Sequence, residues 1–181
     1  MGSTDLQQLE RRARQSYERA RVVRALVGGL PLAVLAVLAA LLSRRPGSIT
    51  VLGPLLFLVG VALLWRGREA GRGLLPGALA GVIPLTMSLV ANLWHGCASG
   101  HCSSWCVPAC TAGGVIAGAL VSVIALRRNL GLGFWAGAST ISLLTGAMGC
   151  SCVGYAGLVA LVAGFSGGVL PQLLRRRFAT R

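Results

Sequence analysis

The sequence predicts an all-α integral membrane protein, a six-transmembrane-helix bundle with both termini in the cytoplasm. Its 181 residues have a mean hydropathy of +0.75 and are 55% hydrophobic, far more than a soluble domain needs for its core. The apolar stretches reach or approach the roughly 20 residues that cross a bilayer, and they occupy residues 22–42, 49–65, 74–94, 109–126, 130–148 and 153–174. Together they form a predicted membrane domain over residues 22–174.

Each stretch has its own justification in the sequence. The first follows about twenty mostly polar residues and has no clear small-x-small cleavage site, so we expect a retained helix and not a signal peptide. The second is the shortest, and the fourth begins in cysteine-rich sequence. The last four contain glycines four residues apart, which let helix backbones approach closely in lipid: Gly77/Gly81, Gly114/Gly118, Gly133/Gly137 and Gly164/Gly168.

The distribution of arginine predicts the orientation. All 17 positive charges are arginines, and all but Arg44 and Arg45 lie in alternate segments: before or at the start of the first helix, between the second and third, between the fourth and fifth, and after the sixth. Positive residues are retained on the cytoplasmic side of membranes. We therefore expect a multi-pass membrane protein with both termini inside, residues 95–110 on the outer side and a basic cytoplasmic tail at residues 175–181.

The net charge of +13 does not indicate direct nucleic-acid binding. The arginines are spread over membrane-flanking segments, where topology and contact with anionic membrane lipids explain them. A proton-coupled transporter is also disfavoured, because the centres of the predicted helices carry no ionisable residue.

Residues 1–21 form a predicted cytoplasmic amphipathic leader. Apolar positions follow one another at steps of three or four residues, as on one face of a helix: Leu6, Leu9, Ala13, Tyr17 and Ala20. Arg11 and Arg14 lie on the opposite face. Such a helix lies on the inner leaflet or docks into a groove of another protein, and the sequence leaves both interpretations open. Because the segment is short, we expect it to become ordered only against a membrane or a partner.

The stretch HGCASGHCSSWCVPAC, residues 95–110, raises the question of a site on the outer side. All six cysteines of the chain fall on the predicted outer side: Cys97, Cys102, Cys106, Cys110, Cys150 and Cys152. Disulfides are the default in an oxidising compartment, and redox-sensitive thiols are a second interpretation. A third is a zinc or copper site formed by these thiolates with His95 and His101, although Pro108 disfavours the continuous helix that would align the cysteines and no CxxC pair is present.

The sequence contains no arrangement typical of an enzyme. Only four acidic residues are present, and no catalytic triad, phosphate-binding loop or paired carboxylates can be recognised. We therefore expect no enzymatic activity, no small-molecule substrate and no resident cofactor beyond the metal interpretation above.

The second half of the chain has a distinctive order of cysteines, small-residue helices and arginine-bearing turns. An outer cysteine, Cys106 or Cys110, precedes a helix that ends in the cytoplasmic turn Ala125-Leu126-Arg127-Arg128-Asn129. A small-residue helix with Trp135-Ala136-Gly137-Ala138 follows, then a second outer cysteine, Cys150 or Cys152, and a glycine-bearing helix that ends in Leu173-Leu174-Arg175-Arg176. In this order the chain resembles the NrsF-type six-helix membrane anti-sigma factors, and it is CarR-like in outline.

The resemblance implies a protein of the bacterial inner membrane, with the cysteine-rich loops in the periplasm, and a binding function. A sigma factor of the extracytoplasmic-function type would be held by the leader, with Leu6, Leu9 and Tyr17 giving apolar contacts and Arg11, Arg12 and Arg14 pairing with acidic residues. An external signal would act through the outer cysteines. The alternative function is a heavy-metal or thiol-handling membrane protein, that is, a metal-uptake component or a thiol oxidoreductase.

Overall fold

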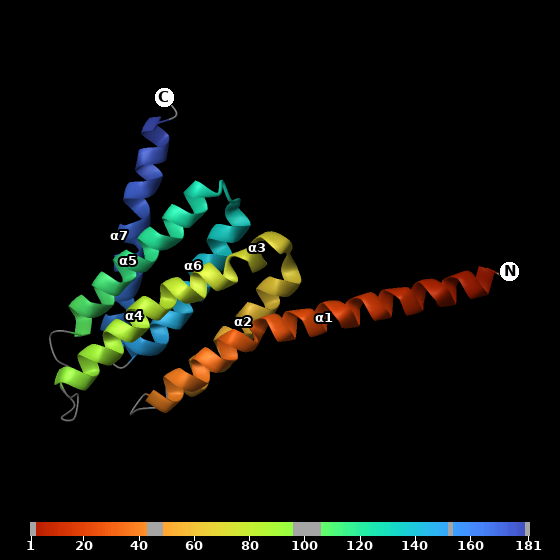
Figure 1. The fold of residues 1–181 in the computed structure, drawn as a ribbon, viewed down its shortest axis with the longest axis horizontal. Helices are drawn as coiled ribbons and strands as arrows, with labels where there is room; N and C mark the ends of the chain where they lie inside the picture. The colour runs from red at the N-terminus through yellow and green to blue at the C-terminus, as the bar shows by residue number, and fades with distance from the viewer. Residues whose placement is uncertain (1–2, 43–48, 96–105, 152–153, 180–181) are drawn as a thin grey trace.

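The computed structural model describes residues 3–42, 49–95, 106–151 and 154–179, and within these ranges every regular element is a helix (Figure 1). The helices are α1 (Ser3–Leu42), α2 (Ile49–Arg66), α3 (Arg68–Arg72), α4 (Leu74–His95), α5 (Cys106–Arg127), α6 (Leu132–Cys150) and α7 (Tyr155–Ala179). The predicted all-α class is confirmed. The short helix α3, in the turn between α2 and α4, was not predicted.

Five helices of the described part, α1, α2, α4, α5 and α7, are long and apolar enough to cross a membrane. The sixth long helix, α6, has 19 residues, contains several glycine, serine and threonine residues, and is not among these five. Most of its residues are buried, and α6 contacts each of the six other helices. Because most of α6 is buried against other helices, with only Leu132, Ala136 and Thr140 exposed, little of its surface has to be apolar.

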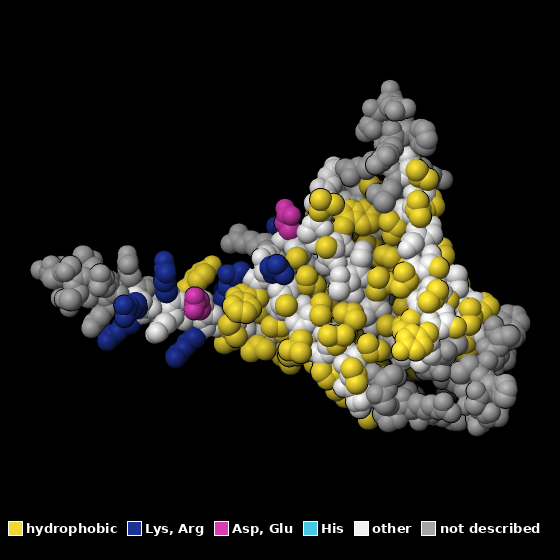
Figure 2. Space-filling model, turned by 180° about the vertical axis from the view of Figure 1, so that it is seen from behind, with side chains coloured by type: hydrophobic (Ala, Val, Ile, Leu, Met, Phe, Trp, Pro, Cys, Tyr) yellow, Lys and Arg dark blue, Asp and Glu magenta, His cyan; other side chains and the backbone are white. Residues whose placement is uncertain are grey.

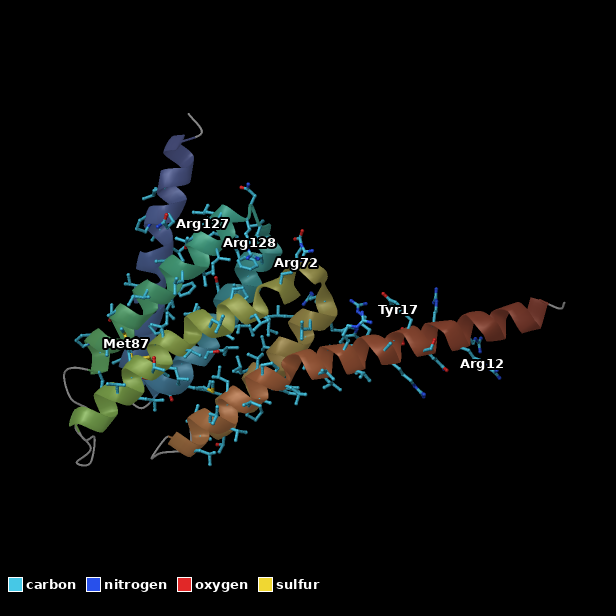
Figure 3. The ribbon with its side chains drawn as sticks, viewed as in Figure 1. Arg12, Tyr17, Arg72, Met87, Arg127 and Arg128 are labelled. Carbon is cyan, nitrogen blue, oxygen red and sulfur yellow. A yellow bond between two sulfur atoms is a disulfide. The ribbon has the colours of Figure 1, made fainter. Side chains whose placement is uncertain are left out.

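The long helices run up and down, so that their ends gather at two opposite ends of the bundle (Figure 1). Arg72, Arg127 and Arg128 lie at one end, and Met87 lies toward the other (Figure 3). On α5, Cys110 precedes Arg127 by seventeen residues, or about 25 Å of helix. The cysteine-bearing end and the arginine-bearing end of α5 are therefore separated by nearly the thickness of a bilayer core.

Helix α1 is a single helix of 40 residues, which joins the predicted leader to the first apolar stretch without a break. No glycine or proline occurs between residues 4 and 27, and Glu10 precedes Arg14 by four residues, a spacing that stabilises a helix. The N-terminal part of α1 projects beyond the bundle as an arm (Figure 1). The leader was expected to become ordered only on a surface or partner, whereas the structure gives it a helical backbone from Ser3 onward.

Close backbone contacts hold the other helices together, as the spacing of the glycines predicted. A Cβ atom at Gly77 of α4 would lie 2.6 Å from the carbonyl oxygen of Ala138 in α6, and one at Gly114 of α5 would lie 2.6 Å from the carbonyl oxygen of Leu161 in α7. Neither position accepts a side chain without displacing a backbone. The α4–α6 and α5–α7 pairs are therefore fixed in register by their small residues.

The Leu-Arg-Arg turn between α5 and α6 has a defined helix-terminating geometry. Asn129 adopts a positive φ of 47°, and the amide of Leu130 donates a hydrogen bond to the carbonyl of Ala125 at 3.0 Å. The amide of Asn129 donates to the carbonyl of Leu126 at 3.3 Å. This pair of bonds is the Schellman arrangement, in which asparagine is one of the few residues that accept the left-handed position.

Candidate functional site

Two of the predicted outer cysteines meet between α5 and α6. The side chains of Cys110 and Cys150 face each other with a Cα–Cα separation of 6.1 Å, which fits the geometry of a disulfide. Both residues are 0% exposed. They lie in an apolar cluster with Ala147, Ala160 and Leu161, so water does not reach the two sulfur atoms in this arrangement.

Cys106 is buried one helical turn before Cys110. It is the first residue of α5, and Pro108 occupies the first turn, where proline is tolerated because the amide it lacks would have no helical partner. The other predicted members of this site, Cys97, His101, Cys102 and Cys152, lie outside the described residues, as does the side chain of His95. Within the described ranges, no group of three or more His, Cys, Asp or Glu residues is arranged to hold a metal ion.

The predicted partner-binding residues lie on the arm of α1. Tyr17 is 70% exposed, and Arg11, Arg12 and Arg14 are also exposed. Figure 2 shows arginine side chains projecting from the arm in several directions, in contrast to the apolar surface of the bundle. Leu6 and Leu9 belong to the same helix, but their side chains lie outside the described part.

Near the base of this arm, α1 contacts the end of α2 through a hydrogen bond. The guanidinium of Arg21 donates to the carbonyl oxygen of Trp65, in the last turn of α2. A cavity of about 570 Å³ opens beside this contact, and its lining includes Tyr17, Arg24 and Arg72. Sequence reasoning missed this site, because Arg72 is far from the leader in sequence; its only signal was the spacing of Arg21 and Arg24, three residues apart.

Helix α6 connects the cysteine pair with the region of the arm. Cys150 is the last residue of α6. Near the start of the same helix, Gly137 packs so closely on α3 that a Cβ atom at Gly137 would lie 2.5 Å from the carbonyl oxygen of Ala70. The next residues of α3, Gly71 and Arg72, line the cavity beside α1. A continuous series of packed elements thus runs from the cysteines to the base of the arm.

Two hydroxyl groups in the middle of α6 interrupt its apolar packing. Ser142 and Thr145 are fully buried, and in the described part of the structure their side-chain oxygens have no hydrogen-bond partner. By contrast, Ser122 of α5 donates to the carbonyl of Gly118 at 2.6 Å. Unpartnered buried hydroxyls are uncommon and cost stability, so these two positions are candidates for stabilising substitution.

The fold and its apolar helices define the class of the molecule: it is an α-helical membrane protein. In comparisons with known proteins, no family model matches the chain, and neither a curated protein nor a solved structure matches it.

Proposed function

We propose that the protein is a membrane-bound negative regulator: an anti-sigma factor that holds a sigma factor of the extracytoplasmic-function type through its N-terminal arm. It would lie in a bacterial inner membrane with six crossings and both termini in the cytoplasm. The observation that carries the proposal is the continuity of α1, which joins an exposed, arginine-rich arm to a membrane-spanning stretch. The order of features shared with NrsF-type anti-sigma factors supports the same function.

The arm has the chemistry that such a partner requires. Its exposed arginines, Arg11, Arg12 and Arg14, match an acidic surface, and Tyr17 offers an exposed aromatic ring beside them. Leu6 and Leu9 would complete the apolar contact on the same helix. Binding of this kind needs no catalytic group, so we propose no enzymatic activity.

In this proposal the outer cysteines receive the signal. A change in the bonding of Cys110 and Cys150 would release the end of α6 from α5, and α6 would pass the movement to α3 and the base of the arm. A change of about 3 kcal/mol in the packing free energy would alter the affinity for the sigma factor roughly a hundredfold.

The first experiment is a pull-down of the membrane-extracted full chain and of a variant that lacks residues 1–21, with identification of co-purified proteins by mass spectrometry. We expect a sigma factor with the full chain only. As a matched control, Arg127→Glu/Arg128→Glu removes two arginines from another turn and should still recover the sigma factor, whereas Arg11→Glu/Arg12→Glu should not. If no sigma factor is recovered with the full chain, or if the truncated chain recovers it equally well, the proposal is wrong.

We propose as the alternative function a heavy-metal or thiol-handling membrane protein, which would require the buried pair Cys110 and Cys150 to become accessible. In that case Cys110→Ser and Cys150→Ser would abolish metal accumulation or thiol turnover, and deletion of residues 1–21 would leave both unchanged. For the anti-sigma function, the deletion should instead switch on transcription of the genes under the sigma factor.

A further inference from the structure

The cavity beside α1 is basic. It is lined by Tyr17, Arg21 and Arg24 from α1, by Leu64 from α2, and by Gly71 and Arg72 from α3. Among the described residues that line it, three are arginines and none is acidic. The acid on α3, Glu69, lies instead toward α6, where a Cβ atom at Gly131 would be 3.0 Å from its Oε2 atom. The cavity therefore presents concentrated positive charge.

This cavity lies at the level where the chain changes from polar to apolar. Its residues on α1 come at the end of the arginine-rich arm, and from Ala25 to Leu42 the helix carries no charged residue. Trp65, whose side chain is 55% exposed, lies beside it at the end of α2. Tryptophan is enriched at the boundary between lipid tails and headgroups, so we expect the cavity at the depth of lipid phosphates.

A shallow apolar groove continues from the cavity along the same helix. It measures about 550 Å³ and is lined only by apolar residues of α1: Val27, Leu30, Pro31, Val34, Leu35 and Leu38. Tyr17 and Arg24 in the cavity and Pro31 and Leu38 in the groove follow one another at intervals of seven residues. Because seven residues make nearly two helical turns, the cavity and the groove lie along one side of α1.

We propose that this side of α1 is a binding site for an anionic phospholipid. The guanidinium groups of Arg24 and Arg72 bind the headgroup phosphate, and the Tyr17 hydroxyl donates a hydrogen bond to it. Arginine suits this role because its planar group can donate two parallel bonds to phosphate oxygens. One acyl chain then lies in the apolar groove. Basic pockets between helices on the cytoplasmic side of a membrane are typical binding sites for acidic lipid headgroups.

The test measures lipid binding by native mass spectrometry of the full chain in detergent. Dioleoyl phosphatidylglycerol is compared with dioleoyl phosphatidylcholine, which has the same chains and no net charge, and with glycerol 3-phosphate and inorganic phosphate, which have no chains. We expect phosphatidylglycerol to bind at least about tenfold more tightly than each of the others. Arg24→Gln/Arg72→Gln should lose this preference, and Arg11→Gln/Arg12→Gln, which removes two charges outside the cavity, should keep it.

Three results would overturn the proposal. Equal binding of the two phospholipids would mean that the cavity does not recognise the headgroup charge. Equal binding of inorganic phosphate or glycerol 3-phosphate would mean a site for a free anion. An equal loss of preference in the Arg11→Gln/Arg12→Gln control would mean that net charge alone attracts the lipid.

A second measurement uses the unmodified chain and does not depend on the folding of a variant. Phosphatidylglycerol with a photoreactive group on one acyl chain is incorporated into vesicles with the protein and activated by light. We expect the label on α1 between residues 27 and 38. Labels spread evenly over α1, α2, α4, α5 and α7 would contradict a specific site.

Discussion

The guanidinium of Arg21 hydrogen-bonds to the carbonyl of Trp65, a residue 44 positions further along the chain. The carbonyls in the last turn of a helix have no partner within the helix, and that end carries partial negative charge. Arg21 therefore satisfies the C-terminal end of α2 and at the same time fixes the base of the α1 arm. A movement of α1 at Arg21 relative to α2 therefore has to break this hydrogen bond.

Replacement of Arg21 by glutamine should loosen this contact. We expect amide hydrogen exchange in the last turn of α2 to become about fivefold faster, since a hydrogen bond to a charged group contributes at least about 1 kcal/mol. Hydrogen–deuterium exchange with mass spectrometry of the detergent-solubilised chain measures this directly. The matched control is Arg19→Gln, which removes an exposed arginine of the same helix and should leave the exchange unchanged.

The pairing of Cys110 and Cys150 predicts a non-additive effect of two substitutions. If the two residues form a disulfide, Cys110→Ala or Cys150→Ala alone removes the whole bond, with a loss of about 2–4 kcal/mol of stability for a loop closed over 40 residues. The double variant should then unfold at about the same temperature as the single variants. Thermal unfolding followed by circular dichroism provides the comparison.

Peptide mapping without reductant gives an independent check on that pair. A cross-linked peptide that contains Cys110 and Cys150 is the expected result, and a pairing of either residue with Cys106 would contradict it. Cys106→Ala should lower stability less than either of the other two single substitutions.

The neighbouring glycines of α7 provide a test of the helix packing. A Cβ atom at Gly168 would collide with the backbone carbonyl of Val115 in α5, whereas one at Gly167 would meet nothing within 4 Å. We expect Gly168→Ala to lower the unfolding free energy by about 2–3 kcal/mol, because the helices must separate. Gly167→Ala should leave the unfolding free energy unchanged or raise it by about a few tenths of a kcal/mol, because alanine favours the helix. Equal effects in a denaturant titration would show that α5 and α7 do not pack in this register.

Replacement of Thr145 by valine should stabilise the bundle. Its hydroxyl is fully buried and has no partner in the described structure, and valine keeps nearly the same shape without a polar group. Relief of the unpaired hydroxyl should raise the unfolding free energy by about 1–2 kcal/mol. Ser122→Ala is the contrasting change, since it removes a hydroxyl that is already bonded, and it should not stabilise the protein. A lower unfolding temperature for Thr145→Val would indicate that the hydroxyl has a partner, such as bound water.

Local signals in the sequence predicted the long helices, although not the short helix α3. Runs of apolar residues have the length of a bilayer crossing, and the arginines mark their ends, so Ile49–Arg66 and Leu74–His95 are close to the predicted stretches at residues 49–65 and 74–94. The glycine spacing likewise identified the surfaces that pack closely. Helix α6, Leu132–Cys150, is the exception: it lies close to the predicted stretch at residues 130–148, but it is not among the five helices that are apolar enough to cross a membrane.

Which distant residues meet depends on how the helices pack, and local sequence patterns do not predict it. Many cysteine pairings were open in the sequence, and Cys110 meets Cys150 because α5 and α6 run antiparallel and place these two ends together. The basic cavity likewise forms only because the turn between α2 and α3 brings Arg72 to α1. The hydrogen bond from Arg21 to Trp65 also joins residues that are 44 positions apart in the sequence. Local periodicity sets the face of a helix, but the packing of all helices together sets what that face touches.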